Sequence, residues 1–322
     1  MNHPARRLLT AALAGALLAS AAPAAFAQTA TTQTAATQTA PAATPAPEPA
    51  RPIRASKIIL VGDSTTQGGS GWGGRFCSDH VVSFVACINL ARGGRSTSNY
   101  RAEGSWDIAL AEMASTTPSG SRAYVDTWVL IQFGHNDQPG KPGRSTDLAT
   151  EFPQNLRRYV AEARERGAIP VLVTPLTRRQ FVDGKLDNDL EPWAAAVRAV
   201  AAETHTPLLD LNADSSAAVQ AMGPSLAAGF AQSPPSPVVA AALLTGTTVP
   251  ANTGAPVPPT TTPAAAPAPA PAQNNAAVEP MGDAKLSFDY THLGPTGAAF
   301  FAAMVTRQLA IAVPALRRSL IN

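Results

Sequence analysis

The sequence lacks a long apolar run anywhere except near its start. There, Arg6 and Arg7 precede the apolar stretch 8–22, which is too short to span a bilayer. The motif "AFA" follows at 25–27 as an A-x-A cleavage site, so the pattern predicts a removable export signal over residues 1–27. We therefore expect an exported protein, periplasmic or secreted, with no membrane insertion after the signal is cleaved.

The sequence also lacks an excess of either charge. Its 24 basic and 22 acidic residues become 22 of each once Arg6 and Arg7 leave with the signal. A neutral chain has no bulk attraction for nucleic acid or for an anionic membrane, so neither is an expected partner. We expect a monomer.

Cysteine is scarce, since Cys77 and Cys87 are the only two. After export both would lie in an oxidising compartment, where disulfides persist. We therefore favour a disulfide between them over two buried thiols. Such a bridge would join the first expected helix to the second expected strand.

Several catalytic signatures are missing as well. The chain has no G-x-S-x-G, which excludes the nucleophile elbow of the α/β-hydrolases, and no P-loop or dinucleotide-binding glycine pattern. A single D-x-x-H at Asp289 and His292 offers too few ligands for a metal site. The sequence therefore predicts chemistry without a metal or a cofactor.

Two segments have too little bulky apolar content to fold. Residues 28–54 are rich in Thr, Gln, Ala and Pro, and residues 230–284 repeat that character with "PPTTTPAAAPAPAPAQNN". We expect a linker over the first and a disordered insert over the second. Residues 55–322 then form a single domain interrupted by the insert, because closing a long loop costs only a logarithmic entropy term.

Between those segments, apolar β-type runs alternate with helical patterns. One helical pattern stops at Gly167, another starts near Pro192, and the last opens at Pro295. The β-type runs are short and apolar on both flanks, and they occur at 57–61, 87–90, 127–133, 169–174 and 207–211. This alternation predicts an α/β fold, in which a buried parallel sheet lies between layers of helices.

Polar motifs follow the first three of these runs. "GDS" with Ser64 follows the first, "RGGR" with Gly93 and Gly94 the second, and "GHND" with Asn136 the third. Ligands of such sheets bind at the carboxyl ends of the strands, so we expect these loops to meet along one edge. The fourth run ends in "TPLTRR", which contains no obvious catalytic residue.

A serine nucleophile needs a base for its proton, and four histidines remain after the signal leaves. His205 precedes the fifth run, at the wrong edge; His80 lies in the first expected helix; and the neighbours of His135 suit binding better than proton transfer. His292 has Asp289 three residues earlier, where one turn can bring the carboxylate onto the ring. That pairing would hold the imidazole tautomer and stabilise the imidazolium, as in a serine triad.

Three groups can supply hydrogen-bond donors for an oxyanion. The Ser64 N–H is expected at the start of a helix, where free N–H groups favour negative charge. A glycine of "RGGR" lets the backbone approach a ligand without a Cβ, and the Asn136 side chain supplies an amide. Each motif is weak alone, but the combination, in this order and each at a strand end, is specific.

In this order the motifs resemble those of the SGNH (GDSL-type) hydrolases, and within them the rhamnogalacturonan acetylesterase branch. "VGDST", "NLARGGRSTSNYRAEGSWD", "FGHND" and "DYTHLGPTG" are similar to the four sequence blocks of that family. The resemblance implies a three-layer α/β/α fold with a five-stranded sheet in the order 2-1-3-4-5, and a serine acyl-enzyme mechanism without metal. Gly94 is preferred to Gly93 as the glycine donor. The catalytic and oxyanion-hole residues would be Ser64, Gly94, Asn136, Asp289 and His292.

The resemblance also implies the removal of O-acetyl groups from a polysaccharide, most of all rhamnogalacturonan or pectin. Four residues are candidates for substrate contact, through pairing with a uronate, stacking on a sugar or hydrogen bonding: Arg95, Arg101, Trp72 and His135. Other roles stay open for these residues. In the alternative, the arginines only solvate their loop or pair with Asp63 or Glu103. The tryptophan is then part of a wall or of the core.

Other functions also fit these residues. The chain could deacetylate bacterial envelope glycans or act as a broad short-chain carboxylesterase. A non-catalytic glycan-binding module is a different class. The set of Ser64, Asp289 and His292 argues against it, because binding needs no nucleophile and base.

Overall fold

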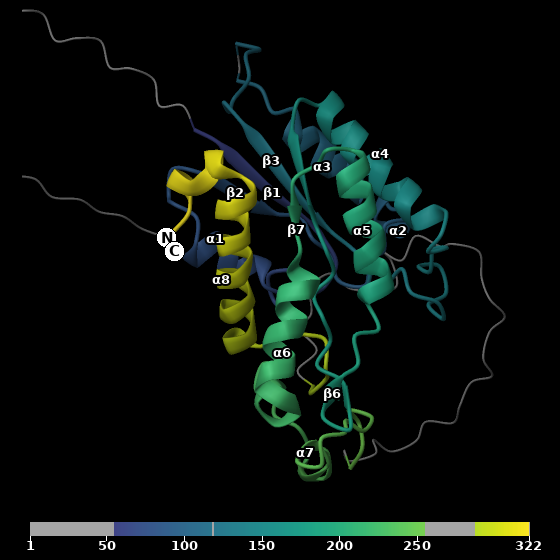
Figure 1. The fold of residues 1–322 in the computed structure, drawn as a ribbon. Coiled ribbons are helices and arrows are strands. Elements are labelled where there is room, and N and C mark those ends of the chain that lie inside the picture. Colours follow the sequence, from purple (N-terminus) through teal and green to yellow (C-terminus); the bar gives the residue numbers. More distant parts are fainter. Residues whose placement is uncertain (1–54, 118, 255–286, 322) are drawn as a thin grey trace, which may run out of the picture. The chain divides into compact units, whose positions relative to one another are not determined.

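The computed structural model describes residues 55–117, 119–254 and 287–321, which belong to one compact unit (Figure 1). The expected signal and linker, and residues 255–286 of the expected insert, lie outside this description. The centre of the unit is a five-stranded parallel sheet in the order β2-β1-β3-β4-β7. Taken in chain order, these strands have the arrangement 2-1-3-4-5, so the predicted α/β fold is confirmed. The strands are β1 (Lys57–Gly62), β2 (Ala86–Asn89), β3 (Thr127–Gln132), β4 (Ile169–Val173) and β7 (Leu208–Leu209).

Helices cover both faces of this sheet (Figure 1). On one face lie α1 (Gly73–Asp79), α6 (Leu211–Ala228) and α8 (Pro295–Ala312). On the other lie α3 (Ser105–Met113), α4 (Glu151–Glu165) and α5 (Glu191–Glu203). Two short helices, α2 (Asn99–Ala102) and α7 (Pro237–Leu243), and a 3-10 helix over Pro314–Ser319 complete the helices of the described ranges.

Each strand serves two hydrophobic cores, because neighbouring side chains point to opposite faces of a sheet. In β1, Ile58 belongs to the cluster that includes Phe301 of α8. The next residue, Ile59, belongs to the cluster that includes Phe152 of α4. This is why the strands appear in the sequence as continuous apolar runs rather than as alternating patterns.

A small antiparallel hairpin follows β4 and was not predicted. It consists of β5 (Phe181–Val182) and β6 (Lys185–Leu186), joined by a turn in which Asp183 and Gly184 have φ values of 48° and 76°. Positive φ at both central residues matches a hairpin turn of type I′. Strands of two residues are too short to show a periodic pattern in the sequence.

The expectation of disorder over 230–284 is wrong for its first part. Residues 230–254 fold around α7, whose capping residue Ser236 accepts a hydrogen bond from the N–H of Val239 (3.2 Å). Val239 is fully buried and packs with Tyr290 from the last described segment. Composition alone underestimates this segment, because its few apolar side chains are buried by a partner far away in the chain.

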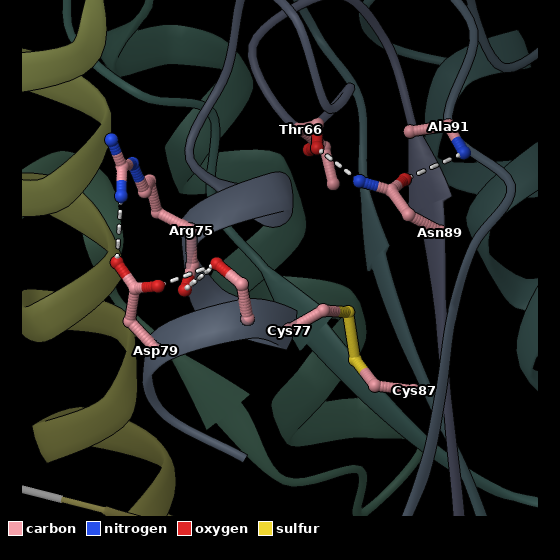
Figure 2. Close-up of a disulfide and its surroundings, with 8 residues drawn as sticks. Thr66, Arg75, Cys77, Asp79, Cys87, Asn89 and Ala91 are labelled. Carbon is pink, nitrogen blue, oxygen red and sulfur yellow. Dashed lines mark hydrogen bonds and ion pairs between the residues drawn. A yellow bond between two sulfur atoms is a disulfide. The ribbon is translucent and has the colours of Figure 1, made fainter.

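The two cysteines form a disulfide that ties α1 to β2 (Figure 2). Cys77 lies on α1 and Cys87 in β2, with their Cα atoms 5.5 Å apart. The bridge therefore joins the two elements named from the sequence. It fixes α1, which follows the loop containing Ser64, against the edge of the sheet.

Candidate active site

Ser64 lies in a tight turn directly after β1. Asp63 organises the turn, since its carbonyl accepts the N–H of Thr66 (3.2 Å) and its Oδ1 accepts the N–H (2.8 Å) and hydroxyl (2.7 Å) of Thr65. The expected helix start at Ser64 is wrong, because α1 begins only at Gly73. The Ser64 N–H is therefore the donor of a turn and has no helix dipole behind it.

Neighbouring strands hold this turn in place. Gln132, at the end of β3, accepts hydrogen bonds from the hydroxyl of Thr66 (2.5 Å) and the indole N–H of Trp72 (2.7 Å). Asn89, at the end of β2, donates to the carbonyl of Thr66 (2.9 Å) and accepts the N–H of Ala91 (3.0 Å) (Figure 2). Asn89 thus links the turn after β1 to the loop after β2.

The serine, histidine and aspartate singled out in the sequence come together at this turn. Nδ1 of His292 lies 2.7 Å from Oδ2 of Asp289, and Nε2 of His292 lies 2.9 Å from Oγ of Ser64. Oδ1 of Asp289 also accepts the backbone N–H groups of Thr291 (2.8 Å) and His292 (2.6 Å), so the single turn expected from D-x-x-H is present. With its proton on Nδ1, the ring leaves Nε2 to accept the serine proton.

Asp289 is held as a carboxylate. Its partial burial would raise its pKa, but the side chain and charge of His292 and the N–H groups of His292 and Thr291 lower the pKa to about 2. An ionised carboxylate at this position favours the imidazolium that forms when His292 takes a proton. The geometry can therefore make Ser64 a nucleophile.

Arg179 holds the backbone of the loop that carries Asp289 and His292. Its buried guanidinium donates to the carbonyls of Thr291 (3.2 Å), Asp289 (3.0 Å) and His292 (2.9 Å), and its own N–H donates to the carbonyl of Tyr290 (2.9 Å). Burial lowers the pKa of Arg179 to about 10, against the charge of Asp289, and the side chain stays protonated at neutral pH. Sequence reasoning missed this residue, because "TPLTRR" gives no sign of what its arginines contact.

Tyr290 supports the same loop through segment 230–254. Its ring is buried with Val239 and Leu243 of α7, and its hydroxyl donates to the carbonyl of Val249 (2.7 Å). The segment taken for disorder is thus part of the support of the candidate base.

Asn136 and Gly94, the other two expected site residues, lie on the loops after β3 and β2. The Asn136 side chain is nearly buried and donates from Nδ2 to the carbonyl of Arg95 (3.0 Å), which fixes the amide against the loop after β2. That loop turns at Gly94, whose φ of 74° favours glycine. Gly93 packs against the nucleophile turn, since a Cβ placed on it would lie 3.6 Å from Cβ of Ser64.

Three residues expected to contact substrate are instead occupied within the fold. Trp72 is fully buried and is a core residue. Arg95 is buried and forms an ion pair with Glu103 (3.0 Å), while Arg101 makes two hydrogen bonds of 2.8 Å to Glu162. Trp72 is thus the core residue that was left open as its other role, and Arg95 holds Glu103, one of the partners left open for it, so substrate contacts at these two positions are wrong. A contact of Arg101 with substrate stays a prediction, since its side chain is 18% exposed.

His135 is also inside the protein, so its expected contact with substrate is wrong. The ring is 2% exposed, and its Nδ1 lies 3.4 Å from Oδ2 of Asp63. Burial lowers the pKa of His135, while the nearby charge of Asp63 opposes this shift. For Asp63, burial would raise the pKa, but His135 and the donors of Thr65 lower it. The buried imidazole therefore lies against the carboxylate that organises the Ser64 turn.

The two remaining described histidines lie away from Ser64. His80 caps the end of α1, and its Nδ1 lies 2.9 Å from the carbonyl of Ile321. His205 has a φ of 50° in the turn before β7. Over the described ranges, no group of three or more His, Cys, Asp or Glu side chains is placed to hold a metal ion. The helices of those ranges are all too short or too polar to cross a membrane.

Comparison with known proteins gives related esterases. The Bacillus subtilis (strain 168) protein named probable rhamnogalacturonan acetylesterase YesY is 37% identical over 157 residues, which are 48% of this chain and 66% of YesY. Rhamnogalacturonan acetylesterase RhgT of the same strain is 35% identical over 179 residues, which are 52% of this chain and 70% of RhgT. The aligned part of the chain thus spans about two thirds of the length of each relative.

Solved structures support the fold. The crystal structure of the Bacillus subtilis protein YxiM superposes with a TM-score of 0.52 at 20% identity, over 81% of this chain and 58% of that one. Residues 60–233, more than half of the chain, match the GDSL-like Lipase/Acylhydrolase family. The resemblance drawn from the four motifs is therefore confirmed, and the chain belongs to this family of carboxylic ester hydrolases.

Proposed function

We propose that the protein is an exported serine esterase that removes O-acetyl groups from a polysaccharide, with rhamnogalacturonan as its substrate. The observation that carries the reaction type is the position of His292, 2.7 Å from Asp289 and 2.9 Å from Ser64. The names of YesY and RhgT support the acyl group and the polymer. The export signal expected over residues 1–27 suits a polymer too large to enter a cell.

In the proposed reaction, Oγ of Ser64 attacks the carbonyl carbon of the acetyl ester while Nε2 of His292 takes the hydroxyl proton. The tetrahedral intermediate expels the sugar oxygen, which leaves as a hydroxyl with the proton from His292. Water then attacks the acetyl-serine and gives its proton to the same nitrogen. Acetate leaves, and Ser64 regains its proton. Throughout, Asp289 keeps the ring oriented and stabilises its charged form.

The negative oxygen of each tetrahedral intermediate needs donors, and three loops meet here to provide them. We assign the N–H of Ser64, the N–H of Gly94 and the side-chain amide of Asn136 to this oxyanion hole. One hydrogen on Nδ2 of Asn136 goes to the carbonyl of Arg95, which fixes the amide plane, and the second is left for the substrate oxygen. Preorganised donors of this kind are usually the largest single contribution to acyl transfer.

Acetate release from acetylated rhamnogalacturonan, with Ser64→Ala alongside, tests the proposal. We expect release by the intact protein and none by the variant, while circular dichroism shows the same fold for both. An intact protein that leaves this polymer acetylated, yet hydrolyses 4-nitrophenyl acetate, would rule out the pectic substrate. Acetylated envelope glycans would be tried next. A protein inactive on every ester, but still binding glycan, would be a binding module.

A further inference from the structure

A pocket of about 470 Å³ lies beside the Ser64 turn, and the proposed chemical steps do not use it. Its walls come from the loop that follows Ser64, from α1 and from the beginning of α8. The volume falls within the ordinary range for small-molecule sites. The lining residues that matter below are Gly68, Gly71, Gly74, Arg75, Ser78 and Leu293.

The pocket is built on the two loops that carry Ser64 and His292. The hydroxyl of Ser70 donates to the carbonyl of Ser64 (2.8 Å), and the carbonyl of Ser70 accepts the N–H of Leu293 (2.8 Å). Leu293 follows His292 directly and lines the pocket. These two hydrogen bonds tie the wall of the pocket to both loops of the candidate active site.

Glycines supply part of the walls of the pocket, where the backbone itself forms the surface. A Cβ on Gly74 would lie 2.7 Å from the carbonyl oxygen of Gly68, and one on Gly71 would lie 2.1 Å from that of Thr65. Side chains are thus excluded there by packing, and N–H and C=O groups come close to the space. Ser78 adds a hydroxyl to the lining. Leu293, Pro295 and Ala298 add apolar surface. Walls of this mixed kind suit a sugar, which has both hydroxyl groups and apolar C–H faces.

Arg75 gives the pocket its charge. Its side chain is 48% exposed, and within the described part of the chain it pairs with Asp79 on the next helical turn, through one hydrogen bond of 3.2 Å (Figure 2). An exposed pair of this kind contributes little, and a guanidinium has five N–H donors. Unlike Arg95 and Arg101, whose carboxylate partners are half-buried or buried, Arg75 can take a ligand carboxylate through two parallel hydrogen bonds.

We infer that this pocket binds a uronosyl residue of the polysaccharide other than the acetylated one, with Arg75 pairing with its carboxylate. The inference rests on the proposed function for the identity of the polymer. It concerns binding, however, and can be tested without any ester. The uronate contact, which the sequence led us to expect at Arg95 or Arg101, is then made by Arg75 of α1.

The test is calorimetric titration of the intact protein with rhamnogalacturonan oligosaccharides that have been chemically deacetylated. We expect Arg75→Gln to weaken binding about two- to fivefold, the range of a solvent-exposed charged contact, and high salt to shrink this difference. Asp79→Asn should strengthen binding, because it removes the competing carboxylate. Arg157→Gln is the matched control: Arg157 is an exposed arginine that pairs with Glu203 on the far helical layer, and its loss should leave binding unchanged.

Equal affinity of Arg75→Gln and the intact protein would overturn the inference, as would equally tight binding of a neutral xylo-oligosaccharide. Undetectable binding of the acidic oligosaccharide by the intact protein would overturn it too. The steady-state counterpart is the ratio of kcat/KM on acetylated rhamnogalacturonan to that on 4-nitrophenyl acetate, which should fall in Arg75→Gln. If the polymer releases no acetate at all, the proposed function fails, while the binding result still decides the uronosyl site.

Discussion

Replacing Arg179 should disable the enzyme without touching a catalytic side chain. Arg179→Met keeps roughly the length of the side chain and removes the donors that hold the carbonyls of Asp289, Thr291 and His292. Each buried carbonyl left without a donor costs about 1–3 kcal/mol. At the lower bound, three such carbonyls reduce the free energy of unfolding by about 3 kcal/mol. This is less than the total stability of a domain, which is about 5–15 kcal/mol. The variant should therefore fold but hold its loop loosely.

The kinetic effect follows from that looseness. A displacement of about 1 Å in a positioned group can cost about a hundredfold in rate. We expect kcat on 4-nitrophenyl acetate to fall by about that factor in Arg179→Met. KM should change little, since Arg179 is buried among protein groups. Arg179→Lys keeps the charge and some donors, so it should recover part of the loss in kcat.

Arg157 again provides the control. It also makes three hydrogen bonds, all to the carboxylate of Glu203, but on the exposed surface. Arg157→Met should cost less than about 1 kcal/mol and leave kcat unchanged. Steady-state kinetics gives kcat and KM of each variant, and urea unfolding gives its free energy of unfolding. A folded Arg179→Met enzyme with the kcat of the intact protein would refute the positioning role, and so would a rise in KM alone.

Three further predictions concern Asp289 and Asn136 of the site and Asp137, a fully buried residue next to Asn136 whose Oδ1 accepts hydrogen bonds from Thr97 and Thr146. Burial raises the pKa of Asp137 to about 7, so stability should fall as pH rises from about 4 to 7, and urea unfolding of Asp137→Asn should lack this decline. The pKa of Asp289 is lowered from 3.8 to about 2, so its stabilising contribution is present above pH 4 and is lost as pH falls towards 2; the stability gap between the intact protein and Asp289→Asn should close over that interval. Asn136→Ala should lower kcat on a small ester by about a hundred- to thousandfold, and a drop under threefold would remove Asn136 from the oxyanion hole.

The sheet could be predicted because its signals are local. Residues such as Ile58 and Ile59 are buried on opposite faces, so each strand is a continuous apolar run whatever its partners are. The site motifs could be placed for a related reason: in a parallel sheet, the residue after each strand necessarily lies at the same edge. Ser64 and Asn136 could be placed at this edge as soon as the ends of β1 and β3 were predicted.

The partners of a charged side chain could be predicted only where they lie nearby in the chain. Glu103, eight residues after Arg95, was among the partners left open for the arginines of its loop. Nothing near Arg101 shows that Glu162 pairs with it, and nothing near Arg179 shows that it reaches the loop of His292. A guanidinium after a strand is equally compatible with substrate, solvent or the fold. Burial decides between these, and burial is a property of the packed molecule.

The spacing of the catalytic residues along the chain has a consequence for folding. Ser64 and His292 are 228 residues apart, and Arg179 lies 113 residues before His292. The disulfide encloses a sequence separation of only 10 residues, so it shortens the first of these closures very little and the second not at all. Contacts of such range slow folding, because the entropy of closing the loop is lost before the contact forms. During refolding, hydrolysis of a small ester should therefore return after the circular dichroism of the sheet and helices.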